Sequence, residues 1–296
     1  MSSPLNMSPQ TEIATINADG VEVFYRSAGS KSAPVVLLLH GFPSSSHMFR
    51  NLIPRLSTRY RVIAPDLPGF GFTVVPAERS YEYTFANLAT TIEAFLDALS
   101  IKKFAVYIFD YGAPTAFRIA LNRPHAITTL VTQNGNAYEE GLGADFWAPL
   151  QQYWATGNLE DREKIRGAAL NFETTKWQYT FGSPHPESIP PEAYHLDTAL
   201  ILRPGNQDIQ LDILYNYRTN ITLYPKFHEY LRSSSVPVLA VWGKNDPIFV
   251  PAGAEGFKKD VKDLEINYLD APHFALETNE VDMAKLMISF FEKRGV

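Results

Sequence analysis

Residues 104–114 read FAVYIFDYGAP, and this stretch decides how the chain folds. The apolar and aromatic run Phe104–Phe109 is typical of a strand buried on both faces of a parallel sheet. It stops at Asp110, and Gly112 and Ala113 then begin a run with helical spacing. A strand that turns sharply into a helix around one polar residue holds that residue in a strained backbone conformation, beside which small residues fit best. From this stretch alone, Asp110 is also compatible with a simple helix N-cap.

Similar apolar runs alternate with helical segments over most of the chain. Residues 84–99 have apolar side chains at helical spacing before the central run, and 281–293 form the expected last helix. This alternation predicts an α/β fold with a mostly parallel, doubly wound sheet, in which ligands bind beyond the carboxyl ends of the strands. The expected strands are residues 12–17, 21–26, 35–39, 60–64, 104–109, 127–131, 236–242 and 264–269.

The alternation lapses between residues 134 and 232, where aromatic residues become dense. Apolar residues fall at helical spacing over 146–154 and 211–217. We therefore expect a core formed by residues 1–133 and 233–296, and a helical cap formed by residues 134–232 that lies over the strand ends. Most aromatic side chains of the cap should form its own core, because aromatic residues dominate core energetics.

Composition excludes several classes of function. The chain has 296 residues, a formal charge of −6 and no Lys/Arg cluster, which argues against a nucleic-acid partner. It has no cysteine, which excludes disulfides, thiolate metal sites and a cysteine nucleophile. No apolar run has the length of a signal peptide core or a membrane span, so we expect a cytoplasmic protein. No phosphate-binding loop or metal-ligand spacing appears, so we expect no cofactor and no metal. The oligomeric state cannot be derived from the sequence.

Three titratable residues follow three of the expected strands. In chain order they are Asp110, Asp246 and His273. Singly, each has a structural explanation: Asp246 lies in an Asn-Asp-Pro turn, and a lone loop histidine is usually structural. Together, at strand ends and in the order nucleophile, acid, histidine, they predict a catalytic triad.

These residues carry a resemblance to the α/β-hydrolase superfamily and, within it, to the epoxide hydrolase and haloalkane dehalogenase branch, in which the nucleophile is Asp. The resemblance spans about residues 21–291. It implies an α/β-hydrolase fold with an inserted helical cap, a small apolar organic substrate, and water as the second substrate. Its carriers are the motifs at residues 40–43, 66–71, 109–112, 242–247 and 273–274.

An Asp nucleophile suits attack on a saturated carbon, because the product is an alkyl ester rather than an anhydride. His273 would then activate the water that hydrolyses this ester, with Asp246 orienting the imidazole. By resemblance, the backbone amides of Phe42 and Tyr111 form the oxyanion hole. His40 and Pro43 are expected to shape their loop rather than to react.

The leaving group separates the two activities. In haloalkane dehalogenases a Trp follows the nucleophile and an Asn often occupies the position of Phe42, whereas this chain has Tyr111 and Phe42. The resemblance therefore favours an epoxide hydrolase, with a haloalkane dehalogenase as the alternative. A non-catalytic protein that binds small ligands is the alternative from another class.

Epoxide hydrolases protonate the opening ring with cap tyrosines. Tyr217, followed by Arg218, matches one of these family tyrosines. The second is not clearly matched; Tyr153 is the candidate, with Tyr138 behind it. Trp154 is a candidate donor for a halide instead.

Overall fold

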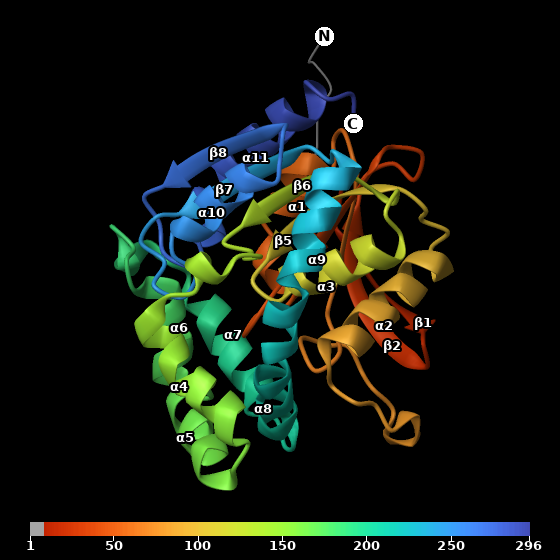
Figure 1. Ribbon diagram of the computed structural model, residues 1–296. Helices are drawn as coiled ribbons and strands as arrows, with labels where there is room; N and C mark the ends of the chain where they lie inside the picture. The colour runs from red at the N-terminus through yellow and green to blue at the C-terminus, as the bar shows by residue number, and fades with distance from the viewer. Residues whose placement is uncertain (1–8) are drawn as a thin grey trace.

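β5 (Phe104–Phe109) lies in the middle of an eight-stranded sheet in the computed structural model, which describes residues 9–296 (Figure 1). The strand order is β1-β2-β4-β3-β5-β6-β7-β8. β1 and β2 pair antiparallel at one edge, and from β4 to β8 every pairing is parallel. The other strands are β1 (Glu12–Ala18), β2 (Val21–Ala28), β3 (Val35–Leu39), β4 (Arg61–Pro65), β6 (Ile127–Gln133), β7 (Val238–Gly243) and β8 (Leu264–Leu269).

Burial follows the position of each strand in the sheet. Every residue of β5 and β7 is buried, because helices cover both faces of the central strands. β1 at the edge is mostly exposed. The predicted α/β fold with a mostly parallel sheet is confirmed, and each expected strand is present within about two residues of its expected bounds.

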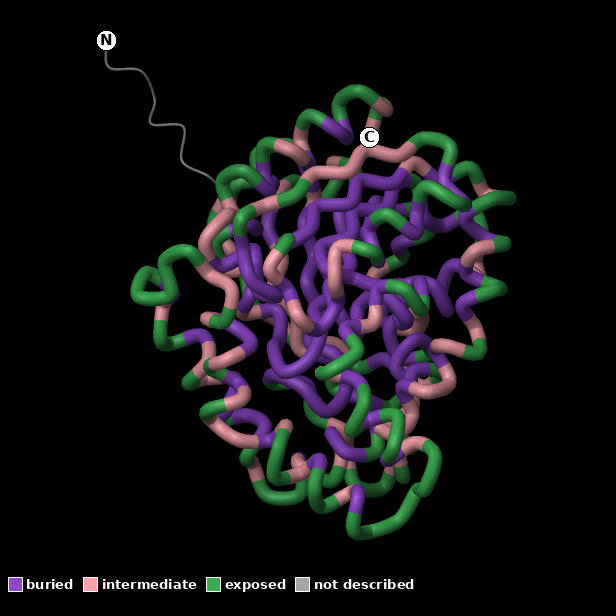
Figure 2. Tube along the Cα trace, turned by 60° about the vertical axis from the view of Figure 1, so that its left-hand side comes forward, coloured by how far each residue is buried: buried purple, intermediate pink, exposed green. Residues whose placement is uncertain are grey.

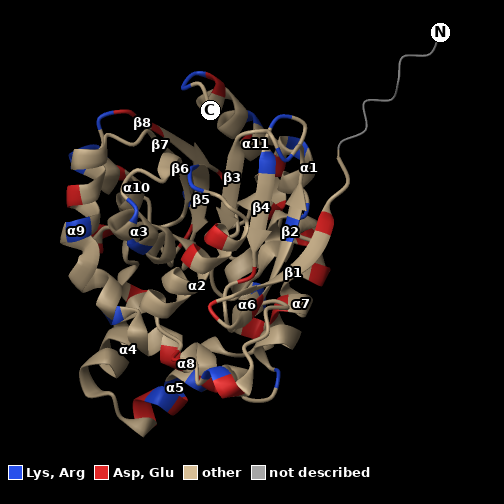
Figure 3. Ribbon diagram, turned by 90° about the vertical axis from the view of Figure 1, so that its right-hand side faces the viewer, with Lys and Arg blue, Asp and Glu red and all other residues tan. Residues whose placement is uncertain are grey.

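Helices cover the two faces of the sheet. The first face carries α2 and α3, whose apolar sides join one large core cluster, and the opposite face carries α1 and α11 (Figure 3). Along the ribbon in the same figure, Lys and Arg are interspersed with Asp and Glu. The helices are α1 (Leu52–Leu56), α2 (Phe85–Ala98), α3 (Gly112–Asn122), α4 (Ala144–Thr156), α5 (Leu159–Ala169), α6 (Phe172–Thr180), α7 (Pro191–Ile201), α8 (Asn206–Asn216), α9 (Arg218–Ser234), α10 (Ala252–Gly256) and α11 (Leu276–Glu292).

Helices α4 to α9 follow β6 and precede β7, and most of them gather at one end of the sheet (Figure 1). Buried segments continue from the sheet into this group of helices, whose outer surfaces are exposed (Figure 2). Hydrogen bonds tie it to the core: Gln210 Nε2 donates to Gly69 O at 2.9 Å, and Asn245 Nδ2 donates to Gly182 O at 2.7 Å. We call residues 134–232 the cap; its proposed end falls inside α9.

Within residues 9–296, no helix has both the length and the apolar character that crossing a membrane would require.

Candidate active site

The end of β5 forms a sharp elbow at Asp110. Asp110 has a φ of 47°, in the left-handed region, and α3 begins two residues later. A Cβ on Gly112 would lie 2.3 Å from the Leu39 carbonyl oxygen, so the close approach to β3 requires glycine there. A Cβ on Gly41 would lie 2.3 Å from Asp110 Oδ1. The two glycines therefore leave room for the strained backbone of Asp110 and for its carboxylate. This elbow geometry shows that Asp110 is not a simple N-cap.

Asp246 and His273 meet beside this elbow. His273 Nδ1 lies 2.7 Å from Asp246 Oδ2, and both side chains are buried. Because Nδ1 pairs with a carboxylate, it carries the proton, which leaves Nε2 as the base. Nε2 is buried and has no hydrogen-bond partner among residues 9–296. Burial alone would lower the pKa of His273, but Asp246 and then Asp110 outweigh burial and raise it above its ordinary value.

The carboxylate of Asp110 is held by the backbone. The Phe42 N–H donates to Asp110 Oδ1 at 2.6 Å. Burial raises the pKa of Asp110 to about 6, and His273 and the amides of Phe42 and Tyr111 oppose this rise because they favour the charged form. The two amides expected from the sequence therefore both face the proposed nucleophile.

Asn134, which directly follows β6, is a site residue that the sequence reasoning missed. Its Nδ2 donates to Asp246 Oδ2 at 2.7 Å, and its Oδ1 accepts from Gly243 N–H at 2.8 Å and from Gln133 Nε2 at 2.6 Å. Its φ of 47° is a conformation that Asn tolerates better than most residues. Its position at a strand end, followed by Gly135, was the available signal.

The loop that supplies the Phe42 amide is built around His40. His40 Nε2 accepts from Leu67 N–H at 2.9 Å, so the proton is on Nδ1, which lies 3.1 Å from Gly41 O. Burial lowers the pKa of His40, which keeps the imidazole neutral. His40 therefore shapes the loop, as expected, and the Phe42–Pro43 peptide bond within it is cis.

A cavity of about 260 Å³ opens between the elbow and the cap. Phe42, Asp110 and Tyr111 line it from the core, and the cap contributes mainly apolar side chains, among them Trp147, Leu150 and Leu214. The volume is far more than the 10–15 Å³ that a single water needs, so the cavity has room for an organic ligand in contact with Asp110.

Comparison with known proteins identifies the fold family. A family model for the alpha/beta hydrolase fold matches residues 34–280. The chain belongs to the α/β-hydrolase family. An uncharacterized hydrolase of Saccharomyces cerevisiae is 52% identical over 276 residues, which cover 92% of this chain and 94% of that protein. Epoxide hydrolase 3 of Siraitia grosvenorii is 29% identical over 90% of this chain and 93% of its own length.

Solved structures show the same fold. The haloalkane dehalogenase DbeA from Bradyrhizobium elkani matches with a TM-score of 0.77 at 20% identity, over 97% of this chain and 99% of that one. The expected resemblance to the branch that holds epoxide hydrolases and haloalkane dehalogenases is therefore confirmed. It does not distinguish between the two activities.

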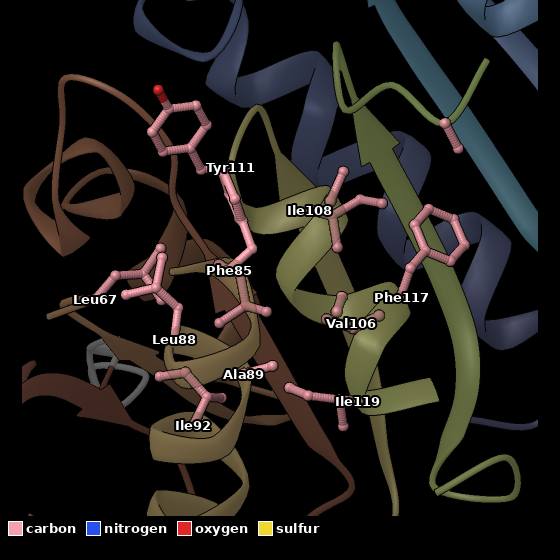
Figure 4. Packing of buried hydrophobic residues seen from close by; sticks show 14 of the residues in the cluster. Leu67, Phe85, Leu88, Ala89, Ile92, Val106, Ile108, Tyr111, Phe117 and Ile119 are labelled. Carbon is pink, nitrogen blue, oxygen red and sulfur yellow. The ribbon is translucent and has the colours of Figure 1, made fainter. Parts of the chain in front are cut away.

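Tyr217 packs behind Tyr111 and does not line the cavity. It is buried, and its ring centroid lies 5.9 Å from that of Tyr111. Its hydroxyl lies 3.5 Å from the Tyr224 hydroxyl, and Tyr217 is not among the residues that line the cavity. Tyr111 does line the cavity, and its buried hydroxyl has no hydrogen-bond partner in the part of the chain that the structure describes. Figure 4 shows the Tyr111 hydroxyl directed away from the labelled core side chains around Phe85.

Three other expectations for the cap need correction. The Tyr153 hydroxyl accepts from Arg162 Nη1 at 3.1 Å, and Tyr153 does not line the cavity. The Tyr138 hydroxyl donates to Asp260 Oδ2 at 2.9 Å. The Trp154 indole N–H donates to Leu214 O at 2.8 Å, so it is not free to hold a halide. The donor groups of Tyr138 and Trp154 are therefore already used within the protein, and Tyr153 does not line the cavity.

Proposed function

We propose that this α/β hydrolase opens an epoxide to a diol through a covalent alkyl ester on Asp110. Two residues that line one apolar cavity carry the proposal: Asp110, and Tyr111, whose hydroxyl has no hydrogen-bond partner among residues 9–296. A departing alkoxide needs a proton as it forms, and a tyrosine hydroxyl can give one, whereas an indole N–H cannot.

In the first step, the free oxygen of Asp110 attacks a ring carbon, the C–O bond of the epoxide breaks, and the ring oxygen takes a proton from tyrosine. Tyr217 is the donor that the family resemblance implies, and Tyr111 is the hydroxyl on the cavity wall. Burial raises the pKa of both phenols well above their ordinary value, so both carry a proton at neutral pH.

In the second step, His273 Nε2 removes a proton from water, and the hydroxide attacks the carbonyl carbon of the ester. Negative charge then develops on the oxygen that Phe42 N–H already holds, Oδ1. Asp246 stabilises the imidazolium through the 2.7 Å contact with Nδ1. His273 returns its proton to the departing diol oxygen as the tetrahedral intermediate collapses. The second proton of the water, left on the new carboxyl group of Asp110, restores the tyrosine that protonated the ring oxygen.

A haloalkane dehalogenase remains the second candidate, because one observation favours it. Trp177 lines the cavity, and within residues 9–296 its indole N–H makes no hydrogen bond, whereas Trp147 donates to Ile248 O at 2.9 Å. An indole N–H is a suitable donor to a halide ion, which needs no proton.

The test is intact-protein mass on a His273→Gln variant incubated with epoxides and with haloalkanes. The second step stalls in this variant, so the ester should accumulate on Asp110. A mass gain equal to the whole epoxide supports the proposal, and a gain equal to haloalkane minus hydrogen halide supports the dehalogenase.

Added Tyr217→Phe and Tyr111→Phe changes identify the proton donor, because the true donor's loss slows adduct formation. An unmodified protein with a broad set of both substrates would refute covalent catalysis and favour a ligand-binding protein. Asp110→Ala is the control, since no adduct can form without the carboxylate.

A further inference from the structure

Gln178 on α6 is a buried polar side chain that the proposed chemistry does not use. It is 2% exposed and lines the same cavity as Asp110. Its amide nitrogen is buried and has no hydrogen-bond partner among residues 9–296. By contrast, the buried glutamines Gln133 and Gln210 both donate through their amide nitrogens, to His273 O and Gly69 O. Leaving a buried amide unpaired costs free energy, so such a group calls for a partner.

The neighbours of Gln178 hold it in place. Tyr179 stacks on Phe274 at 3.7 Å between ring centroids, and its hydroxyl donates to Asp197 at 2.5 Å. On the other side, Trp177 lies parallel to the ring of Phe146 at 6.2 Å. With both sequence neighbours anchored in the last turn of α6, the amide of Gln178 cannot turn outward to reach water without disturbing this packing.

Among residues 9–296, no other polar group bonds to the amide nitrogen of Gln178. Thr174, one turn earlier on α6, also lines the cavity, but its hydroxyl already donates to Ala168 O. Asp145 lies on the cavity wall but is exposed. Most remaining lining side chains are apolar, and an isolated water is held well only with two to four polar partners. The missing partner is therefore best supplied by the ligand itself.

We propose that Gln178 binds a second oxygen of the substrate, so that the substrate is an epoxide bearing an ether, hydroxyl or carbonyl oxygen rather than a plain hydrocarbon epoxide. This inference rests on the proposed function. Because Gln178 and Asp110 line one cavity, a single molecule can contact both. An analogue that lacks the oxygen leaves the Gln178 amide without a hydrogen bond, so its kcat/KM should be lower. Gln178 would therefore determine specificity.

The experiment compares matched epoxides. 1,2-Epoxy-5-phenylpentane is the hydrocarbon reference, and two ether analogues replace its second or third chain CH2, counted from the epoxide ring, by oxygen: benzyl glycidyl ether and 2-(2-phenoxyethyl)oxirane. Wild-type protein should turn over at least one ether about tenfold or more faster, in kcat/KM, than the hydrocarbon. Gln178→Met, which keeps the side-chain length without the amide, should bring this ratio close to one. Gln151→Met, an exposed position on α4, is the matched control and should keep the preference.

Binding of the corresponding diols, measured by thermal shift, separates the two proposals. If no epoxide reacts but ether diols stabilise the wild type more than the hydrocarbon diol, and Gln178→Met abolishes the difference, oxygen recognition stands while the proposed reaction fails. If epoxides react but no ether is preferred, or the preference survives in Gln178→Met, the role of Gln178 is refuted and the reaction stands. Should Gln178→Met not fold, the wild-type ratios alone still decide, because equal rates would refute the inference.

Discussion

Asn134→Gly should slow hydrolysis of the covalent intermediate and leave its formation nearly unchanged. Asn134 donates one of the hydrogen bonds to the Asp246 carboxylate, which also receives the Ile248 N–H at 2.7 Å. Glycine tolerates the φ of 47° at this position, so the change removes the side chain without adding backbone strain. A hydrogen bond to a charged group contributes about 1.5–3 kcal/mol, and each 1.4 kcal/mol is a factor of ten, so hydrolysis should slow about 10- to 100-fold.

Under the proposed mechanism the effect is selective, because only the second step uses His273, which Asp246 orients through the 2.7 Å contact. Rapid-quench mass spectrometry on a single turnover measures formation and decay of the ester on Asp110 separately. The pH profile of the decay should also shift, since Asp246 raises the pKa of His273. Asn136→Gly, in the same loop but bonded to Tyr138 O, is the control. Equal slowing of both steps, or unchanged decay, would show that Asn134 does not act through Asp246.

Two further predictions concern ionisation. Burial raises the pKa of Asp110 to about 6, so the rate of ester formation should fall as the pH drops through that value. Hydrolysis of the ester needs neutral His273, whose pKa is raised, so its rate should already fall at higher pH. Lowering the pH from about 8 should therefore lengthen the lifetime of the ester before it slows ester formation, and a ratio of the two rates that does not change with pH would contradict this assignment. Burial also raises the pKa of Asp197 to about 8, so the stability tied to its uncharged form is complete below the ordinary value and is lost as the pH rises toward 8. Asn at position 197 keeps an oxygen that can accept from the Tyr179 hydroxyl. The unfolding free energy of Asp197→Asn, relative to the wild type, should therefore rise by about 4 kcal/mol from pH 5 to pH 8. Thermal unfolding that gives the same difference between the two proteins at both pH values would rule this out.

Much of the fold follows from the sequence because the central strands have a strong local pattern. Phe104–Phe109 is apolar throughout and is buried throughout. The cap was expected only as a helical region, since packing against neighbours, rather than residue type, decides which side chain faces the cavity. Trp154 illustrates this limit: its indole lies parallel to Tyr217, and its N–H is held by a carbonyl of α8.

The triad was predictable for a different reason. Asp246 and His273 lie 27 residues apart, but parallel strands bring their carboxyl ends to the same edge, so topology alone places them together. The roles of Asn134 and Gln178 were not predictable, because each depends on which hydrogen bonds other groups leave open. Such accounting requires coordinates for every buried polar atom.

The Phe42 contact makes the two oxygens of Asp110 chemically distinct. Oδ1 is held by an amide at 2.6 Å, which leaves Oδ2 as the attacking atom. Under the proposed mechanism the bond broken in hydrolysis is the one between the carboxyl carbon and Oδ2, and the incoming water oxygen replaces it. The atom that departs with each diol therefore belonged to the polypeptide, and the protein rebuilds its own side chain from solvent on every cycle.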